Sequence, residues 1–128
     1  DVCVSEIVGA IGGSEGAAII INNARRFLKP NGLMIPERSI TKMAVVTLPD
    51  QILHHPQFSQ TPAYYTQKIF EQVGYPFDLR VCIKKFPQAN VLSTVDVLED
   101  LKFNEYISPE FSHEVNFEIQ KNGRMDGF

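Results

Sequence analysis

The pattern of apolar and polar positions predicts four elements in the first 36 residues. Residues 1–6, with apolar side chains at positions 2–4, are typical of a short buried strand, and three glycines within residues 8–14 predict a loop. Apolar side chains then recur at helical spacing over residues 17–28, with Ser14 placed as the N-cap. Residues 33–35 form a second apolar strand. This order is that of the tail of a parallel α/β unit.

Strand-like patterns dominate the remainder of the chain. Residues 38–48 are rich in Ile, Val and Thr and predict a long strand, and residues 91–97 and 101–103 also look extended. Residues 114–120 alternate polar and apolar side chains, which is the clearest strand pattern in the sequence. Asn122-Gly123 then gives a two-residue hairpin signal, so a return strand is expected after it.

One helix interrupts this β-rich part. Residues 49–61 contain several Pro and His residues and predict a loop, residues 63–73 have helical spacing, and residues 79–86 fit a helix or a strand equally well. The whole pattern predicts an α+β chain, mainly β: the end of an α/β unit over residues 1–36, then a sandwich or barrel with an inserted helix over residues 37–128. Because both ends lie within predicted strands, we expect an excised piece of a longer protein.

Composition narrows the classes of partner. The chain has 128 residues, 12 Lys plus Arg, 15 Asp plus Glu and a formal net charge of −3. A general nucleic-acid binder normally carries a strong basic excess, so we expect no nucleic-acid partner. The longest apolar run, residues 17–21, is too short to cross a bilayer, and we expect no membrane partner. With 9 Phe and 4 Tyr, the chain is too aromatic for a disordered segment.

The cysteine pattern bears on the cellular compartment. The two cysteines, Cys3 and Cys82, have no paired spacing, which predicts two buried free thiols in a reducing compartment. No basic segment followed by an apolar core opens the chain, so no secretory signal is visible. We therefore predict a cytoplasmic protein.

Two glutamates carry the strongest candidate chemistry. Ser5-Glu6 stands at the carboxyl end of the first predicted strand, the edge at which open α/β sheets bind ligands, and Glu15 follows across the glycine-rich loop. Two carboxylates on one pocket suit a guanidinium, whose N–H donors form a fixed fork. The alternative is an exposed loop with two solvated glutamates. No spacing links His54, His55 and His113 as metal ligands, and we expect no metal site.

A longer run of residues resembles a known family. The segments SEIVG (residues 5–9), Glu15 and ARRFLKPNGLMIPER (residues 24–38) resemble the double-glutamate loop region of the protein arginine methyltransferases. That family has a Ser-Glu start, a second Glu nine residues on, a helix, and a Pro- and Gly-containing step into a β-barrel. The similarity extends over nearly the whole chain and is weaker after residue 48.

The resemblance implies a fold, an activity and a cofactor. Residues 1–36 would end a Rossmann-like catalytic domain, and residues 37–128 would form part of a β-barrel domain for substrate binding and dimerisation, with a homo-oligomeric contact near residues 62–90. Glu6 and Glu15 would be the catalytic pair that grips a guanidinium substrate, with Ser5 near the site, and S-adenosylmethionine would supply the methyl group. Because the family's cofactor motif precedes this segment, the isolated chain would be inactive and would not bind S-adenosylmethionine tightly, which calorimetry can test.

Two other functions fit the same residues. The loop over residues 7–14 has no aromatic residue, whereas the family's loop is rich in them. This favours a non-catalytic, β-rich oligomerisation or substrate-docking module with a vestigial glutamate pair. A third hypothesis is a methyltransferase that acts on a small amine or another nucleophile in place of a protein arginine.

Overall fold

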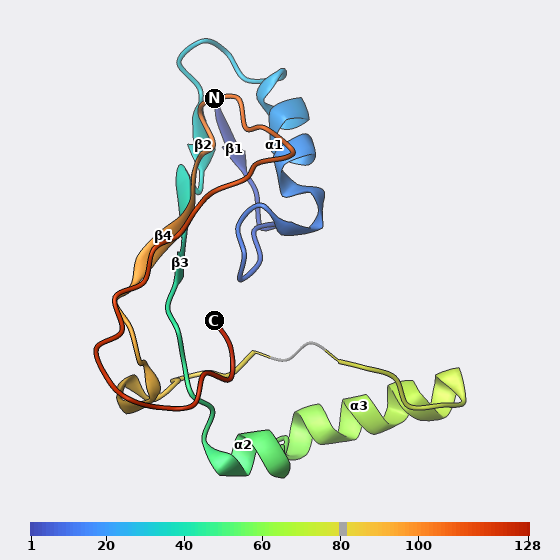
Figure 1. The fold of residues 1–128 in the computed structure, drawn as a ribbon. Coiled ribbons are helices and arrows are strands. Elements are labelled where there is room, and N and C mark those ends of the chain that lie inside the picture. Colours follow the sequence, from blue (N-terminus) through green and yellow to red (C-terminus); the bar gives the residue numbers. More distant parts are fainter. Residues whose placement is uncertain (80–81) are drawn as a thin grey trace.

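The computed structural model describes residues 1–79 and 82–128 and has an α+β architecture with short sheets (Figure 1). The strands form two separate two-stranded sheets, so no barrel is closed within the described residues. In chain order the elements are β1 (Val2–Val4), a 3-10 turn (Ser14–Gly16), α1 (Ala17–Arg25), β2 (Leu33–Ile35), β3 (Arg38–Met43), α2 (Asp50–His54), α3 (Gln60–Val73), a 3-10 turn (Gln88–Asn90) and β4 (Asp96–Lys102). More of the described residues lie in helices than in strands, so the predicted mainly β chain does not form.

The first unit follows the predicted strand–loop–helix–strand order. Strands β1 and β2 are parallel neighbours, with Cys3 opposite Met34, and the chain crosses between them through α1. The inner face of this sheet packs on the helix, whereas Val4 on the outer face is 74% exposed. The prediction of a buried first strand is therefore right for one face only, because no described segment covers the other face. Both cysteines are free, but Cys82 is exposed, contrary to the predicted burial.

The helix α1 begins later than predicted. Gly16, in the left-handed conformation at φ 76°, is its N-cap, and the Ser14 hydroxyl instead donates a hydrogen bond to the carbonyl of Ile11 at 2.7 Å. The regular helix also ends at Arg25, after which short-range turn bonds carry the chain on, and Phe27 is left 89% exposed.

The main apolar core joins the two predicted parts of the chain. Phe103, from the residues that follow β4, is fully buried together with Ile21 of α1 and lies in a cluster with Met34 of β2. Asn22 strengthens this junction, since its side-chain amide donates to the carbonyl of Ile107 at 2.7 Å and its oxygen accepts from the Ile107 N–H at 3.0 Å. Residues 1–36 thus share a core with residues from the second predicted part.

The second sheet is the antiparallel ladder of β3 and β4. It runs from the first unit at one end to the helices α2 and α3 at the other (Figure 1). Its register pairs Arg38 with Lys102 and Met43 with Asp96, with an irregularity after Thr41. The strand predicted over residues 38–48 therefore stops at Met43, and only an isolated bridge at Val46 continues the pairing.

The strand predicted over residues 114–120 does not form, and neither does its hairpin. Only Ile119 makes an isolated bridge, with Ser93. The Phe128 ring stacks on Phe117 with 5.8 Å between the ring centroids, but the backbone of Gly127 pairs with Val46 and not with this segment. An alternating pattern marks a half-buried face, but a strand also needs a neighbour that satisfies its backbone groups.

The helical arm consists of α2 and α3, which extend away from the β3–β4 ladder (Figure 1). The short helix α2 occupies part of the predicted loop of residues 49–61, which is a correction. The longer α3 confirms the predicted helix and ends at Gly74, whose φ of 91° is easy only for glycine. Neither helix buries a residue. Part of the ambiguous segment of residues 79–86 lies outside the described residues.

Candidate functional site

Ser5 and Glu6 lie where the sequence predicts, directly after the carboxyl end of β1. The Ser5 N–H donates to the carbonyl of Ile35 at 2.8 Å, which extends the β1–β2 pairing by one residue. Glu6 follows as the chain leaves the sheet, and it is exposed. In parallel sheets the carboxyl edge is the ligand-binding edge, so Glu6 occupies a position from which it can meet a ligand.

Glu15 lies at the other end of the loop, in the 3-10 turn that leads into α1. Its backbone is left-handed, with φ 60° and ψ 22°, and Gly16 is also left-handed. A left-handed conformation costs a residue with a Cβ about 1–2 kcal/mol. The side chain is exposed in the first turn before α1. Because strained non-glycine residues concentrate at functional sites, this conformation is a reason to consider Glu15 as a ligand contact.

The structure places the two glutamates at opposite ends of one loop and records no bond between them. Within residues 1–79 and 82–128, neither carboxylate forms a hydrogen bond or an ion pair. Both are therefore free to receive a cation from solvent. The loop itself is fixed at Gly12 and Gly13, by contacts that could not be predicted from the sequence.

Those contacts are made by Thr41 of β3 and Glu99 of β4, which are direct cross-strand partners. The Gly12 N–H donates to Thr41 Oγ1 at 3.1 Å, and the Thr41 hydroxyl donates to Glu99 Oε1 at 2.6 Å. The Gly13 N–H donates to the same Oε1 at 3.0 Å. Glu99 is 6% exposed, and its Oε2 is buried without a partner in the described structure. We name these four residues, Gly12, Gly13, Thr41 and Glu99, the loop clamp.

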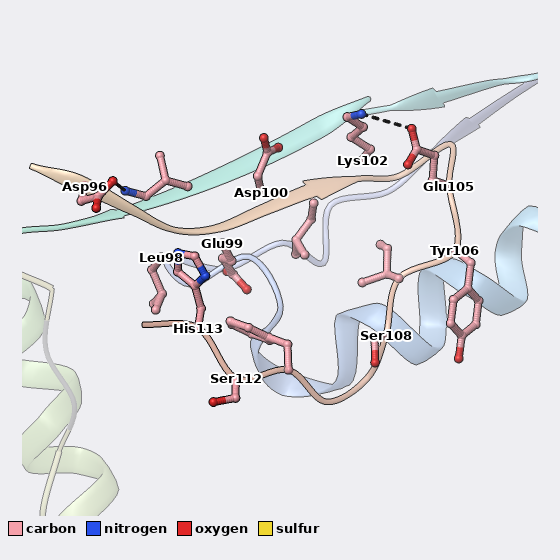
Figure 2. A pocket seen from close by; sticks show the side chains of 14 residues that line it. Asp96, Leu98, Glu99, Asp100, Lys102, Glu105, Tyr106, Ser108, Ser112 and His113 are labelled. Carbon is pink, nitrogen blue, oxygen red and sulfur yellow. Dashed lines mark hydrogen bonds and ion pairs between the residues drawn. The ribbon is translucent and has the colours of Figure 1, made fainter. Parts of the chain in front are cut away.

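A cavity of about 590 Å³ lies between β4 and residues 105–113, and Glu99 is one of the residues that line it (Figure 2). Figure 2 shows the Glu99 side chain directed toward this space, which Phe111 and His113 also line. Glu6 and Glu15 do not line it. The cavity lining therefore includes Glu99 of the loop clamp but not the predicted catalytic pair.

The sequence contains a signal that could have identified Glu99, although Glu99 was not among the predicted site residues. Val97, Glu99 and Leu101 alternate in the sequence, so a regular strand would place Glu99 as an acidic residue on an otherwise apolar face. Charged residues are rarely buried unless they are paired, and such a position indicates a polar contact. The partner, Thr41, could not be identified because cross-strand register is a tertiary property.

The strongest electrostatic perturbation lies away from the glutamate pair, at Asp126. Hydrogen bonds from Arg124 at 2.6 Å, from the Leu48 N–H at 2.7 Å and from the Thr47 hydroxyl at 3.0 Å lower its pKa to about 2. These bonds hold the end of the chain against the residues before α2, so this carboxylate has a structural role.

No metal or membrane feature stands out in the part of the chain that the structure describes. No group of three or more His, Cys, Asp and Glu residues is arranged to hold a metal ion there. His54 and His55 are exposed at the end of α2. Within the same residues, no helix has both the length and the apolar character that a membrane span requires.

Comparisons with known proteins do not assign the site. No protein-family model, no curated protein and no solved structure matched this chain. Any function for this chain is therefore inferred from Glu6, Glu15 and the loop clamp and from their geometry.

Proposed function

We propose that this chain is part of an S-adenosylmethionine-dependent methyltransferase that methylates a guanidinium nitrogen, with protein arginine as the substrate class. Glu6 and Glu15 would be its catalytic pair. The observation that carries the proposal is the position of Glu6 at the carboxyl edge of a parallel β1–α1–β2 unit, with Glu15 exposed at the start of α1. In the finer form of the proposal, residues 1–36 end a Rossmann-like domain and residues 37–128 belong to a β-barrel domain, in a cytoplasmic enzyme.

The chemistry of the two carboxylates fits a cationic ligand. A guanidinium has its lone pairs delocalised and releases a proton reluctantly. Carboxylates that accept from its N–H groups hold its plane, fix the approach of one nitrogen and favour positive charge on the far side of the group. One carboxylate can also accept the proton that this nitrogen releases as it gains a methyl group.

The cofactor, when bound, supplies an electrophilic methyl group on a positively charged sulfonium. Exposed carboxylates at the edge of β1 suit a nearby cation, so this part of the chain is compatible with such a group. Ser5 lies at the same edge. We assign no residue of this chain to hold the nucleoside part of the cofactor.

Substitution of the two glutamates tests the proposal in the full-length protein. Methyl transfer from labelled S-adenosylmethionine to an arginine peptide should fall about 100-fold or more in kcat/KM for Glu6→Gln and for Glu15→Gln. Glu114→Gln is the matched control, because Glu114 is exposed and distant in sequence, and it should stay within about twofold of wild type. Unchanged methylation by Glu6→Gln would defeat the catalytic assignment. Transfer to free amines but not to arginine would favour a small-amine substrate.

A non-catalytic oligomerisation module is the second candidate, and the exposed surface favours it. The accessible surface is 10123 Å². A compact monomer of this mass exposes about 6,800 Å². The difference is larger than the surface hidden in one standard interface, about 1,600 Å² in total. Exposed large apolar side chains occur on the helical arm, such as Tyr65, and on the outer face of β1 and β2, such as Val4.

The helical arm offers the surface for a second copy of the chain. Tyr65, Ile69 and Val73 follow each other at intervals of four residues on α3 and are 60%, 47% and 46% exposed. We propose a homo-oligomer that covers this stripe. Sedimentation should show an oligomer for wild type and a monomer for Ile69→Glu, whereas Gln67→Glu, which adds the same charge on the opposite side of α3, should leave the mass unchanged. A monomeric wild-type protein at high concentration would contradict this proposal.

A further inference from the structure

The loop between the two proposed catalytic glutamates is held at one place by groups from a different part of the chain. Gly12 and Gly13 lie in the second half of this loop, and both of their N–H groups are bonded to the Thr41–Glu99 pair. Thr41 is 9% exposed and Glu99 is 6% exposed, so water competes little for these bonds. Without these bonds, a loop of this length would be free to move at Gly12 and Gly13.

Steric contacts indicate that the loop is seated closely on the ladder. A Cβ added at Gly12 would lie 2.5 Å from Ser39 Oγ, and one added at Gly13 would lie 2.7 Å from Glu99 Oε2. Real Cβ atoms essentially never approach another atom this closely, so a larger residue at either position would force the Ser39 or Glu99 side chain to shift. The glycine pair and the buried acid are therefore parts of one arrangement.

Glu99 is unusual because it uses only half of its carboxylate. Its Oε1 accepts from two donors, whereas Oε2 has none within the described residues. Burying a carboxylate is costly, and a purely structural position would be served as well by an apolar side chain. A buried acid at this position is explained if its role is to hold the Gly12–Gly13 turn in one exact place.

We propose that Thr41 and Glu99 are positioning residues for the glutamate pair: by fixing the Gly12–Gly13 turn they set the distance and orientation of Glu6 and Glu15 for a planar cation. The inference rests on the proposed function. Neither residue touches the substrate in this scheme. Thr41 and Glu99 act through the loop, because Glu6 and Glu15 stand at its two ends.

Thr41→Val is the main test, because valine keeps the shape of threonine and removes the hydroxyl. In the full-length protein, hydrogen exchange of the Gly12 and Gly13 amides should become about tenfold faster or more. Thr41→Ser restores the hydroxyl and should exchange within about threefold of wild type. Thr61→Val is the matched control, because it makes the same substitution at an exposed position of α3, and it should leave exchange unchanged. Unchanged exchange in Thr41→Val would overturn the proposal.

Kinetics then separate positioning from simple stability. For Thr41→Val, KM for an arginine peptide should rise about tenfold, while the Kd for S-adenosylmethionine stays within about twofold and Thr41→Ser recovers the wild-type KM. A variant that is only less stable would keep its KM once folded, and that result overturns the proposal. Where Thr41→Val does not fold, Gly13→Ala disturbs the same contact from the loop side, and the same rise in KM is expected; an unchanged KM overturns the proposal.

The failure of the proposed function can be told apart from the failure of this inference. If the wild-type protein transfers no methyl group, the proposed activity is wrong, and binding of ethylguanidinium measured by calorimetry replaces KM. About tenfold weaker binding by Thr41→Val than by wild type supports the positioning role. Equal binding by the two proteins overturns it.

Discussion

The burial of Phe103 leads to a quantitative prediction about how the two parts of the chain are joined. Phe103 is 0% exposed and packs in the core of α1 and β2, although it follows β4 in the sequence. A buried aromatic side chain removes about 150–250 Å² from water, which corresponds to about 4–6 kcal/mol at about 25 cal/mol per Å². Alanine keeps the Cβ, so Phe103→Ala should lower the free energy of unfolding by about 3–5 kcal/mol.

Urea denaturation followed by circular dichroism and by the fluorescence of the four tyrosines measures this loss. Phe27→Ala is the matched control, since Phe27 is 89% exposed, and it should change the free energy of unfolding by less than about 0.5 kcal/mol. Both probes should report one transition in wild type, because the core joins residues from both predicted parts of the chain. A loss below about 1 kcal/mol for Phe103→Ala, or equal losses for the two variants, would refute the packing described here.

Two further predictions concern polar contacts that tie distant segments together. Asn22→Ala should lower the free energy of unfolding by about 1–3 kcal/mol, because both backbone groups of Ile107 lose their partner, whereas Asn23→Ala on the exposed side should be nearly neutral. Asp126 has its pKa lowered to about 2 from its ordinary value of 3.8, so its stabilising contribution is present above the unfolded value and is lost as pH falls toward 2. Asp126→Asn should therefore flatten the decrease in thermal stability between about pH 4 and pH 2. An unchanged profile for Asp126→Asn, or equal losses for the two asparagine variants, would contradict these assignments.

Local signals in the sequence were sufficient where an element is determined by its own residues. The parallel unit of β1, α1 and β2 has the predicted order, and α3 has the predicted spacing and the glycine that ends it. These elements depend on apolar periodicity and on turn and capping chemistry within a few residues. Even here the start of α1 was wrong, because Ser14 bonds to Ile11 and leaves the cap position to Gly16.

Predictions failed where a strand needs a partner from far along the chain. Residues 114–120 have the clearest alternation, yet they form only an isolated bridge, since the residues after them pair with Val46 and not with them. The candidate site divides in the same way. Glu6 and Glu15 could be selected from the sequence. Glu6 lies at the predicted sheet edge, whereas Glu15 lies in the 3-10 turn before α1 and not in the first turn of the helix. The loop clamp could not be selected from the sequence, because it depends on the register between β3 and β4.

The sequence by itself determined the local elements of this protein, the glycine-rich loop and the two acidic residues that flank it, because each follows from neighbouring residues. Only the tertiary structure decided that Phe103 completes the core of the first unit and that Thr41 and Glu99 hold Gly12 and Gly13. The physical reason is that burial and hydrogen bonding between segments depend on which strands pair and in which register. A pattern along one segment shows that a face will be covered, but it does not show what covers it.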